Sequence, residues 1–152
     1  MAKGFMGNLM SGLAGNLTQM DNKAVQEQYG RFLLDNEEIF QAYVLIRDVI
    51  IFTNIRMIII DKQGATGKKM SVKSIFLMNI VDCEMETAGA GIDDSEITIT
   101  YLTNVKRTSL HQNLESYKME FPKKAQIEGL FKWLFAIAYR NRLEINEIKA
   151  EE

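Results

Sequence analysis

The segment "DVIIFTNIRMIIID", residues 48–61, contains two apolar runs separated by a short polar break. The first run covers residues 49–52 and the second covers residues 57–60. Neither run alternates between polar and apolar residues, so two strands formed here carry apolar side chains on both faces. One face of such a hairpin can line a core. The second face must also be kept out of water, and the sequence leaves open what covers it.

The residues on either side of this hairpin predict a β-rich domain. Alternating side chains predict a strand at 39–47, and four later segments predict strands at 69–76, 80–87, 96–102 and 114–121. The connections are too short for a parallel crossover of roughly a dozen residues, so we expect an antiparallel meander. Residues 124–140 follow Pro122 and keep helical spacing of apolar residues. The pattern predicts a mainly β fold, a seven-stranded antiparallel barrel or sandwich capped by a C-terminal α-helix.

The first 34 residues are predicted to form a helical extension. Apolar residues recur with helical spacing near the amino terminus, although glycines weaken the pattern: Phe5, Met6, Leu9, Met10, Leu13 and Leu17. Asp21 is a candidate N-cap for a second helix that runs to about Leu34. We therefore expect an extension at 1–34, the β-domain at 35–141 and a polar tail at 142–152.

Composition limits the function. The 152 residues carry a formal net charge of -2, which argues against a nucleic-acid partner. The only cysteine, Cys83, cannot form an internal disulfide, and the only histidine, His111, has no second histidine with which to hold a metal. No apolar run approaches the roughly 18 residues of a membrane-spanning helix. We expect a cytoplasmic protein without a metal or cofactor.

Three pieces of sequence together resemble a known family. The run "LIRDVIIFTNIRMIIIDKQGATGKKMSVKSI" at 45–75 and "VDCEMETAGAG" at 81–91 combine "FTNIR", "DKQGATGKK" and "ETAG". This combination resembles the bacterial pleckstrin-homology-like (PH-like) domain family over residues 36–138. The resemblance implies a barrel of two near-orthogonal sheets plugged by the C-terminal helix. It also implies closed, ring-like homo-oligomers and no catalytic residues.

The chemical motifs are weak. "GATGKK" at 64–69 has only two residues between its glycines and precedes a strand, unlike a phosphate-binding loop. Four lysines form a basic cluster that is a candidate contact for an anionic headgroup or an acidic partner: Lys62, Lys68, Lys69 and Lys73. The 47–48 junction is too short to cradle a headgroup, which favours solvated lysines. Cys83 lies between Asp82 and Glu84, whose charges suppress a thiolate. No catalytic pair stands out, so we expect no enzyme.

The apolar surface exceeds what one core requires. With a rotation of 100° per residue, the apolar residues of the last helix span an arc of about 200° around its axis. The hairpin in addition has a second apolar face. Residues 1–34 can cover part of this surplus, and neighbouring copies in a closed ring can cover the rest. The predicted oligomer interface consists of Ile58, Ile59, Ile60, Trp133 and Ile137.

Two functions remain open at this stage. The first is a non-enzymatic homo-oligomeric scaffold that presents a repeated binding surface to an unknown protein partner. The alternative is a peripheral membrane module that gains avidity by gathering several weak amphipathic helices. Its predicted membrane contacts are Phe5, Met6, Leu9, Met10 and Leu13. The same segment packs on its own chain or on a neighbour in the competing interpretation.

Overall fold

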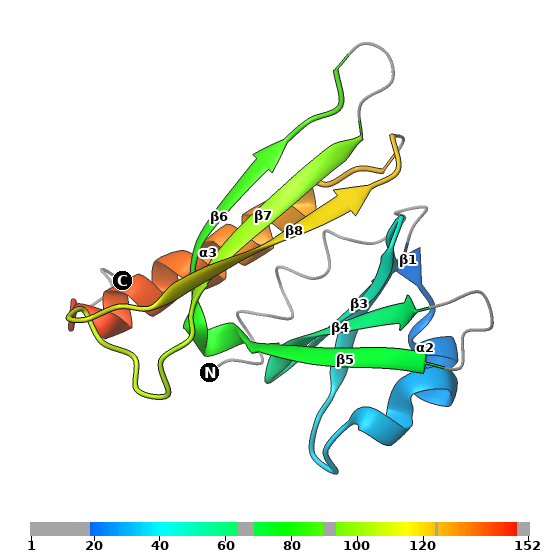
Figure 1. The fold of residues 1–152 in the computed structure, drawn as a ribbon, viewed down its shortest axis with the longest axis horizontal. Helices are drawn as coiled ribbons and strands as arrows, with labels where there is room; N and C mark the ends of the chain where they lie inside the picture. The colour runs from blue at the N-terminus through cyan, green and yellow to red at the C-terminus, as the bar shows by residue number, and fades with distance from the viewer. Residues whose placement is uncertain (1–18, 64–68, 90–93, 124, 149–152) are drawn as a thin grey trace.

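The computed structural model describes residues 19–63, 69–89, 94–123 and 125–148, and shows two antiparallel sheets with helices beside them (Figure 1). The first sheet contains, in spatial order, β1 (Gln19–Met20), β2 (Ile39–Val44), β3 (Asp48–Thr53), β4 (Arg56–Gln63) and β5 (Lys69–Phe76). The second contains β6 (Ile80–Glu86), β7 (Ser95–Leu102) and β8 (Leu114–Phe121). The helical elements are α2 (Asn22–Tyr29), η2 (Gly30–Phe32), η3 (Leu77–Asn79) and α3 (Glu128–Ile145).

The seven predicted strands and the C-terminal helix are present, and the antiparallel prediction is confirmed. The sheets meet at two corners. The chain passes from β5 to β6 through η3, and the Ile46 N–H donates to the Glu120 carbonyl at 3.4 Å. In Figure 1, α3 runs along the second sheet, and α2 lies beside the first.

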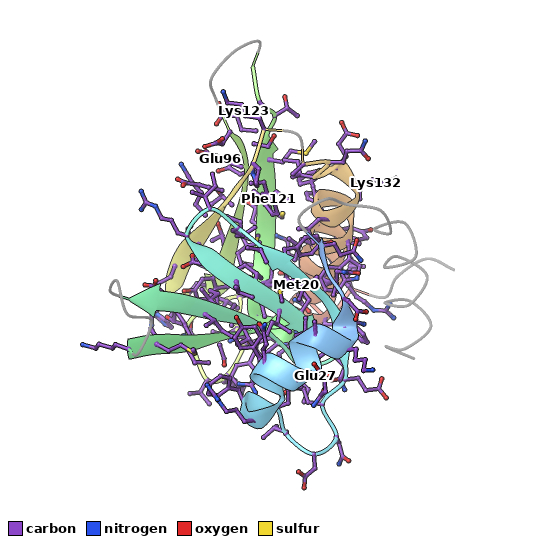
Figure 2. The ribbon with its side chains drawn as sticks, turned by 90° about the vertical axis from the view of Figure 1, so that its right-hand side faces the viewer. Met20, Glu27, Glu96, Phe121, Lys123 and Lys132 are labelled. Carbon is purple, nitrogen blue, oxygen red and sulfur yellow. The ribbon has the colours of Figure 1, made fainter. Side chains whose placement is uncertain are left out.

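The hairpin at 48–61 is covered on both faces by its own chain. One face contributes four side chains to the core between the two sheets and α3: Ile50, Phe52, Met57 and Ile59. The other face contributes four side chains to a second core: Val49, Ile51, Ile58 and Ile60. Val25 and Tyr29 of α2 close this second core, and Phe32 and Leu33 pack against it. The residues around α2 are therefore the cover for the second face (Figure 2, where Met20 and Glu27 mark β1 and α2).

The five predicted interface side chains are consequently inside the molecule. Their exposed fractions are 0% for Ile58, 5% for Ile59, 0% for Ile60, 0% for Trp133 and 6% for Ile137. Trp133 packs edge-on against Phe52, with 5.1 Å between ring centroids. The expectation that these five residues form a surplus apolar surface is corrected, because two cores rather than one use both faces of the hairpin, and Trp133 and Ile137 of α3 pack in the main core. Self-association has to rest on other residues.

Three boundaries differ from the sequence prediction. Residues 19–20, expected to be helical, form the short strand β1 at the edge of the first sheet. The second helix is shorter than expected, since α2 ends at Tyr29 and a 3₁₀ turn follows; Asp21 precedes it without a side-chain capping bond. At the other end, α3 continues through Ile145 and takes up the first residues of the segment expected to be a tail.

A buried ion pair fastens the segment after α2 to the hairpin turn. Both oxygens of Glu37 accept hydrogen bonds from Arg56, from Nε at 2.8 Å and from Nη2 at 2.9 Å. Thr53 Oγ1 and the Leu34 N–H also donate to this carboxylate, at 2.7 and 3.0 Å. Arg56 Nη2 donates in addition to the Phe32 carbonyl at 2.6 Å. This network holds the chain that covers the second core in place.

Candidate functional site

Polar side chains from five strands come together at one end of the interface between the two sheets. Strand alternation places these side chains on the inner faces, beyond the apolar core: Asp48, Asp61, Lys73, Tyr101, Glu115 and Tyr117. We call this set the barrel mouth. Asp48 of β3 lies directly opposite Asp61 of β4. Two like charges in this arrangement repel each other, so hydrogen-bond donors and positive charges nearby stabilise the barrel mouth.

Lys73 joins the sheets across the mouth. Its amino group donates to the Tyr101 hydroxyl at 3.0 Å and lies 5.6 Å from the centre of the Tyr101 ring. The same hydroxyl donates to Glu115 at 3.0 Å, and Lys73 Nζ lies 3.9 Å from that carboxylate. The hydrogen bond to Tyr101 is the main cause that raises the pKa of Lys73, with further contributions from the nearby Tyr101 and Glu115. Lys73 is thus engaged within the chain.

The other three lysines of the predicted basic cluster are described only in part. Lys69 is exposed at the start of β5. Lys68 and the side chain of Lys62 lie outside the described residues, so their predicted contact with an anion stays a prediction. In the described ranges Lys69 is exposed, and Lys73, whose side chain is 52% exposed, lies beside the Glu115 carboxylate.

Tyr117 makes a second link across the mouth. Its hydroxyl donates to the Asp48 carboxylate, which connects β8 with β3. Burial raises the pKa of Tyr117, and the hydrogen bond to Asp48 and the negative charges nearby raise it further. A hollow of about 280 Å³ adjoins this pair and is lined by Leu45, Arg47, Asp48, Tyr117, Lys118 and Glu120. Arg47 and Glu120 lie 4.0 Å apart, so the hollow carries both signs of charge.

Cys83 behaves as the sequence predicts. It is 4% exposed and packs in the main core. Burial, followed by the charges of Asp82 and Glu84, raises the pKa of the Cys83 thiol to about 12. The sequence identified the two carboxylates but not burial, which is the larger cause. In the described ranges no group of three or more histidine, cysteine, aspartate or glutamate side chains is placed to hold a metal ion.

The outer side of α3 presents an aromatic face that the predicted interface residues did not include. Phe135 is 48% exposed and Tyr139 is 59% exposed, and the Phe131 and Phe135 rings stack with centroids 5.7 Å apart. Charged residues flank these rings, and Figure 2 shows Lys132 on the side of α3 away from the sheets. The sequence contained a signal for this face: residues 131, 135 and 139 are four apart and form one row along the helix. This row lies beside the row of buried residues 130, 134 and 137 and is separate from it.

The comparisons with known proteins agree with this architecture. Residues 8–138 match the family of bacterial PH domains. The chain is 32% identical to a pleckstrin homology domain from Shewanella amazonensis SB2B, with a TM-score of 0.59 over 85% of this chain and 97% of that one. It is 31% identical to a protein with a pleckstrin-homology domain from Shewanella loihica PV-4, with a TM-score of 0.60 over 82% of this chain and 99% of that one.

A relative is also found among curated proteins. The chain is 43% identical over 90 residues to the uncharacterized protein YjqA of Bacillus subtilis (strain 168). The aligned segment covers 59% of this chain and 72% of the relative. The fold is therefore PH-like, a small barrel of two antiparallel sheets with a C-terminal helix. The chain belongs to the bacterial PH domain family, as its sequence resemblance predicts. Among the described helices, none is both long enough and apolar enough to cross a bilayer.

Proposed function

We propose that this PH-like domain is a non-enzymatic, cytoplasmic protein-binding module that works as a homo-oligomer joined through the aromatic face of α3. The observation that carries this proposal is the exposure of Phe135 and Tyr139 beside Phe131 on a helix whose opposite side is fully packed. Exposed aromatic rings within a charged surround are typical of protein interfaces. The barrel mouth supports the non-catalytic part, because Lys73 and Tyr117 are each bound to a carboxylate of the same chain.

The aromatic face is suited to a second copy of itself. Two α3 helices that cross antiparallel at Phe135 place Phe131 of one copy against Tyr139 of the other. The same arrangement brings Glu128, near the start of one helix, toward Arg142, near the end of the other. Contacts about a twofold axis are self-complementary in this way. Arg142 is already engaged in its own chain, since its Nε donates to the Val81 carbonyl and its guanidinium lies 3.6 Å from Asp82, so the aromatic rings rather than this ion pair carry the contact.

The strength of this contact has an upper limit. One helix pair buries less than the roughly 800 Å² per partner of an ordinary stable interface. We therefore expect association with a Kd on the order of micromolar, which ring closure or further contacts would strengthen by avidity. Repeated copies then present the domain's free surfaces to a partner protein together.

Sedimentation equilibrium of the full chain over a wide concentration range tests this proposal. We expect the wild type to show a concentration-dependent mass and Phe135→Glu to remain a monomer with unchanged circular dichroism. Val105→Glu is the matched control, since Val105 is a fully exposed apolar residue in the loop between β7 and β8. A wild type that is monomeric throughout, or a Phe135→Glu protein with wild-type mass, contradicts the proposal.

The peripheral membrane alternative depends on Phe5, Met6, Leu9, Met10 and Leu13, which lie outside the described residues. Nothing in the described part of the chain favours it. Vesicle flotation of the full chain and of a chain that lacks residues 1–20 tests it: equal flotation of both, or none for either, removes the membrane interpretation.

A further inference from the structure

A hollow of about 170 Å³ opens on the outer face of the second sheet, the face that points away from the main core. Its base is apolar. Leu102 is 2% exposed but is part of neither core, and Leu114 lies opposite it in the register. The remaining lining comes from β6, β7, the β7–β8 loop and the end of α3: Val81, Asp82, Thr100, Thr108, Gln112, Arg142, Ile145 and Asn146.

The wall that the β7–β8 loop contributes is held by contacts within the chain. Arg107 Nη1 donates to the Met78 carbonyl at 3.0 Å, and its Nη2 donates to Glu144 at 2.9 Å. Within the loop, the Asn113 N–H donates to Asn104 Oδ1 at 2.9 Å. The hollow is therefore formed before any occupant arrives, which lowers the entropic cost of binding.

The sheet face beside the hollow is acidic. Side chains alternate along β7, so the residues between the core positions 97, 99 and 101 point outward. Figure 2 shows Glu96 on the side of the second sheet away from Lys132 of α3. Strands β6 and β8 add further carboxylates to this face, which in total carries five: Asp82, Glu84, Glu86, Glu96 and Glu120.

Three of these carboxylates lie in one line across the strands. The register pairs Glu96 with Glu86 on one side and with Glu120 on the other. Like charges directly opposite each other destabilise a sheet, so this line has a cost in stability. Lys118 offsets part of it, and the hydrogen bond with Glu96, followed by the charges of the surrounding glutamates, raises the pKa of Lys118.

The cations near this face do not neutralise it. Each of three cations pairs with one carboxylate: Arg142 with Asp82 at 3.6 Å, Lys118 with Glu96 at 3.1 Å and Arg47 with Glu120 at 4.0 Å. In the described ranges, Glu84 and Glu86 have no ion-pair partner. A second hollow, of about 240 Å³, lies between these two glutamates, Glu96 and Lys118. The face therefore keeps an excess of negative charge next to an apolar hollow.

Volume and charge together define the occupant. A cavity of about 150 Å³ holds one benzene-sized ring, whereas pockets for drug-sized molecules measure about 300–1,000 Å³. The first hollow thus fits a single apolar side chain. The carboxylates attract lysine and arginine and repel phosphate groups and anionic lipids. Glu84 and Glu86 follow Asp82 at the two-residue repeat of a strand, about 7 Å, which an extended peptide matches with its alternate side chains.

We propose that the outer face of the second sheet binds an extended, lysine- or arginine-rich segment of a partner protein. One apolar side chain of this segment enters the hollow above Leu102, and its cations lie beside Glu84 and Glu86. This inference rests on the protein-binding function proposed above and names the surface and the class of partner. It does not depend on the contact through α3.

A synthetic peptide with blocked ends is the probe. It has one leucine and then three lysines at alternate positions, separated by threonines, and a second peptide has the reversed order to cover the opposite chain direction. Titration into the ¹⁵N-labelled full chain, followed by NMR, locates the site. We expect one of the two peptides to shift the amide signals of residues 82–86, 98–102 and 114–118. Shifts confined to other parts of the chain, or no shift with either peptide at about 1 mM, overturn the proposal.

Two changed peptides separate the contributions of charge and hollow. Glutamate in place of the lysines should weaken binding by at least about tenfold. Alanine in place of the leucine should weaken it by at least about fivefold, because the methylene groups no longer fill the hollow. Equal affinity of the lysine and glutamate peptides, or of the leucine and alanine peptides, contradicts the assigned site.

A pair of protein variants with the same change in net charge tests the position of the site. Glu84→Lys on the acidic face should weaken binding of the lysine peptide by at least about tenfold, whereas Glu27→Lys on the exposed side of α2 should change it little. Circular dichroism verifies that both variants are folded. Equal losses would show attraction by overall charge and would overturn the proposal.

Self-association is distinguished from this binding by two measurements. Phe135→Glu should bind the peptide with wild-type affinity, so failure of the α3 contact and failure of this site are separate results. Without peptide, the amide signals of residues 82–86 should not change on dilution. A change on dilution would show that a second copy of the chain covers this face and would overturn the proposal.

Discussion

The most informative perturbation of the fold is Glu37→Gln, which keeps the size of the side chain and removes its charge. Glu37 is 8% exposed, and its carboxylate accepts two hydrogen bonds from Arg56 and one each from Thr53 and the Leu34 N–H. Removing one member of a buried ion pair costs about 3–5 kcal/mol, because the other charge is left without compensation. Arg56 is partly open to water, so we expect about 3 kcal/mol. In a domain of this size that loss corresponds to a decrease in Tm of about 6–12 °C.

The stability that Glu37 contributes should depend on pH in a defined direction. Burial by itself raises the pKa of Glu37, but the hydrogen bonds from Arg56, Thr53 and the Leu34 N–H, with the Arg56 charge, lower it by more, so the folded pKa is below the ordinary value. Stability from this group is therefore complete above the ordinary carboxyl pKa and is lost as the pH falls through the folded pKa. The Glu37→Gln protein has no carboxylate at this position and therefore does not lose this contribution on acidification. The difference in unfolding free energy between wild type and Glu37→Gln should consequently shrink below about pH 4.

Urea unfolding followed by circular dichroism at pH 7 and at several values below pH 5 measures both effects. Glu27→Gln on the exposed side of α2 is the control, with an expected change below about 0.5 kcal/mol. The double variant Glu37→Gln with Arg56→Met should lose less than the sum of the two single losses, because the residues are coupled. A loss below about 1 kcal/mol for Glu37→Gln at pH 7, or a difference from wild type that grows on acidification, refutes the reasoning.

Three other predictions follow from burial. Because the pKa of the Cys83 thiol is raised to about 12, its alkylation at pH 8 should be at least about 100-fold slower in the folded protein than in urea; comparable rates would contradict its burial. Tyr117→Phe removes the bond to Asp48 and should cost about 1.5 kcal/mol in urea unfolding, whereas Tyr139→Phe should change little, and equal losses would argue against the mouth link. Trp133→Ala should cost about 3–5 kcal/mol by creating a core cavity, and a small loss in unfolding free energy would show that Trp133 is not packed as described.

The local pattern determined most of the architecture. Strand alternation, short connections and the position of Pro122 were sufficient for seven antiparallel strands and a closing helix, since these features depend on neighbouring residues. Consecutive apolar residues in the 48–61 hairpin also showed that both of its faces need cover. Carboxylates next to Cys83 indicated an unreactive thiol. Burial, the larger cause, was not visible from sequence neighbours.

Only the tertiary structure decided what meets each apolar face. The sequence gives a side chain its hydrophobicity, but burial depends on contacts between residues that are distant in the chain. Residues around α2 cover Ile58 and Ile60, which sequence alone could equally assign to a second copy. The same reason explains α3, where Trp133 faces inward and Phe135 outward although both are aromatic.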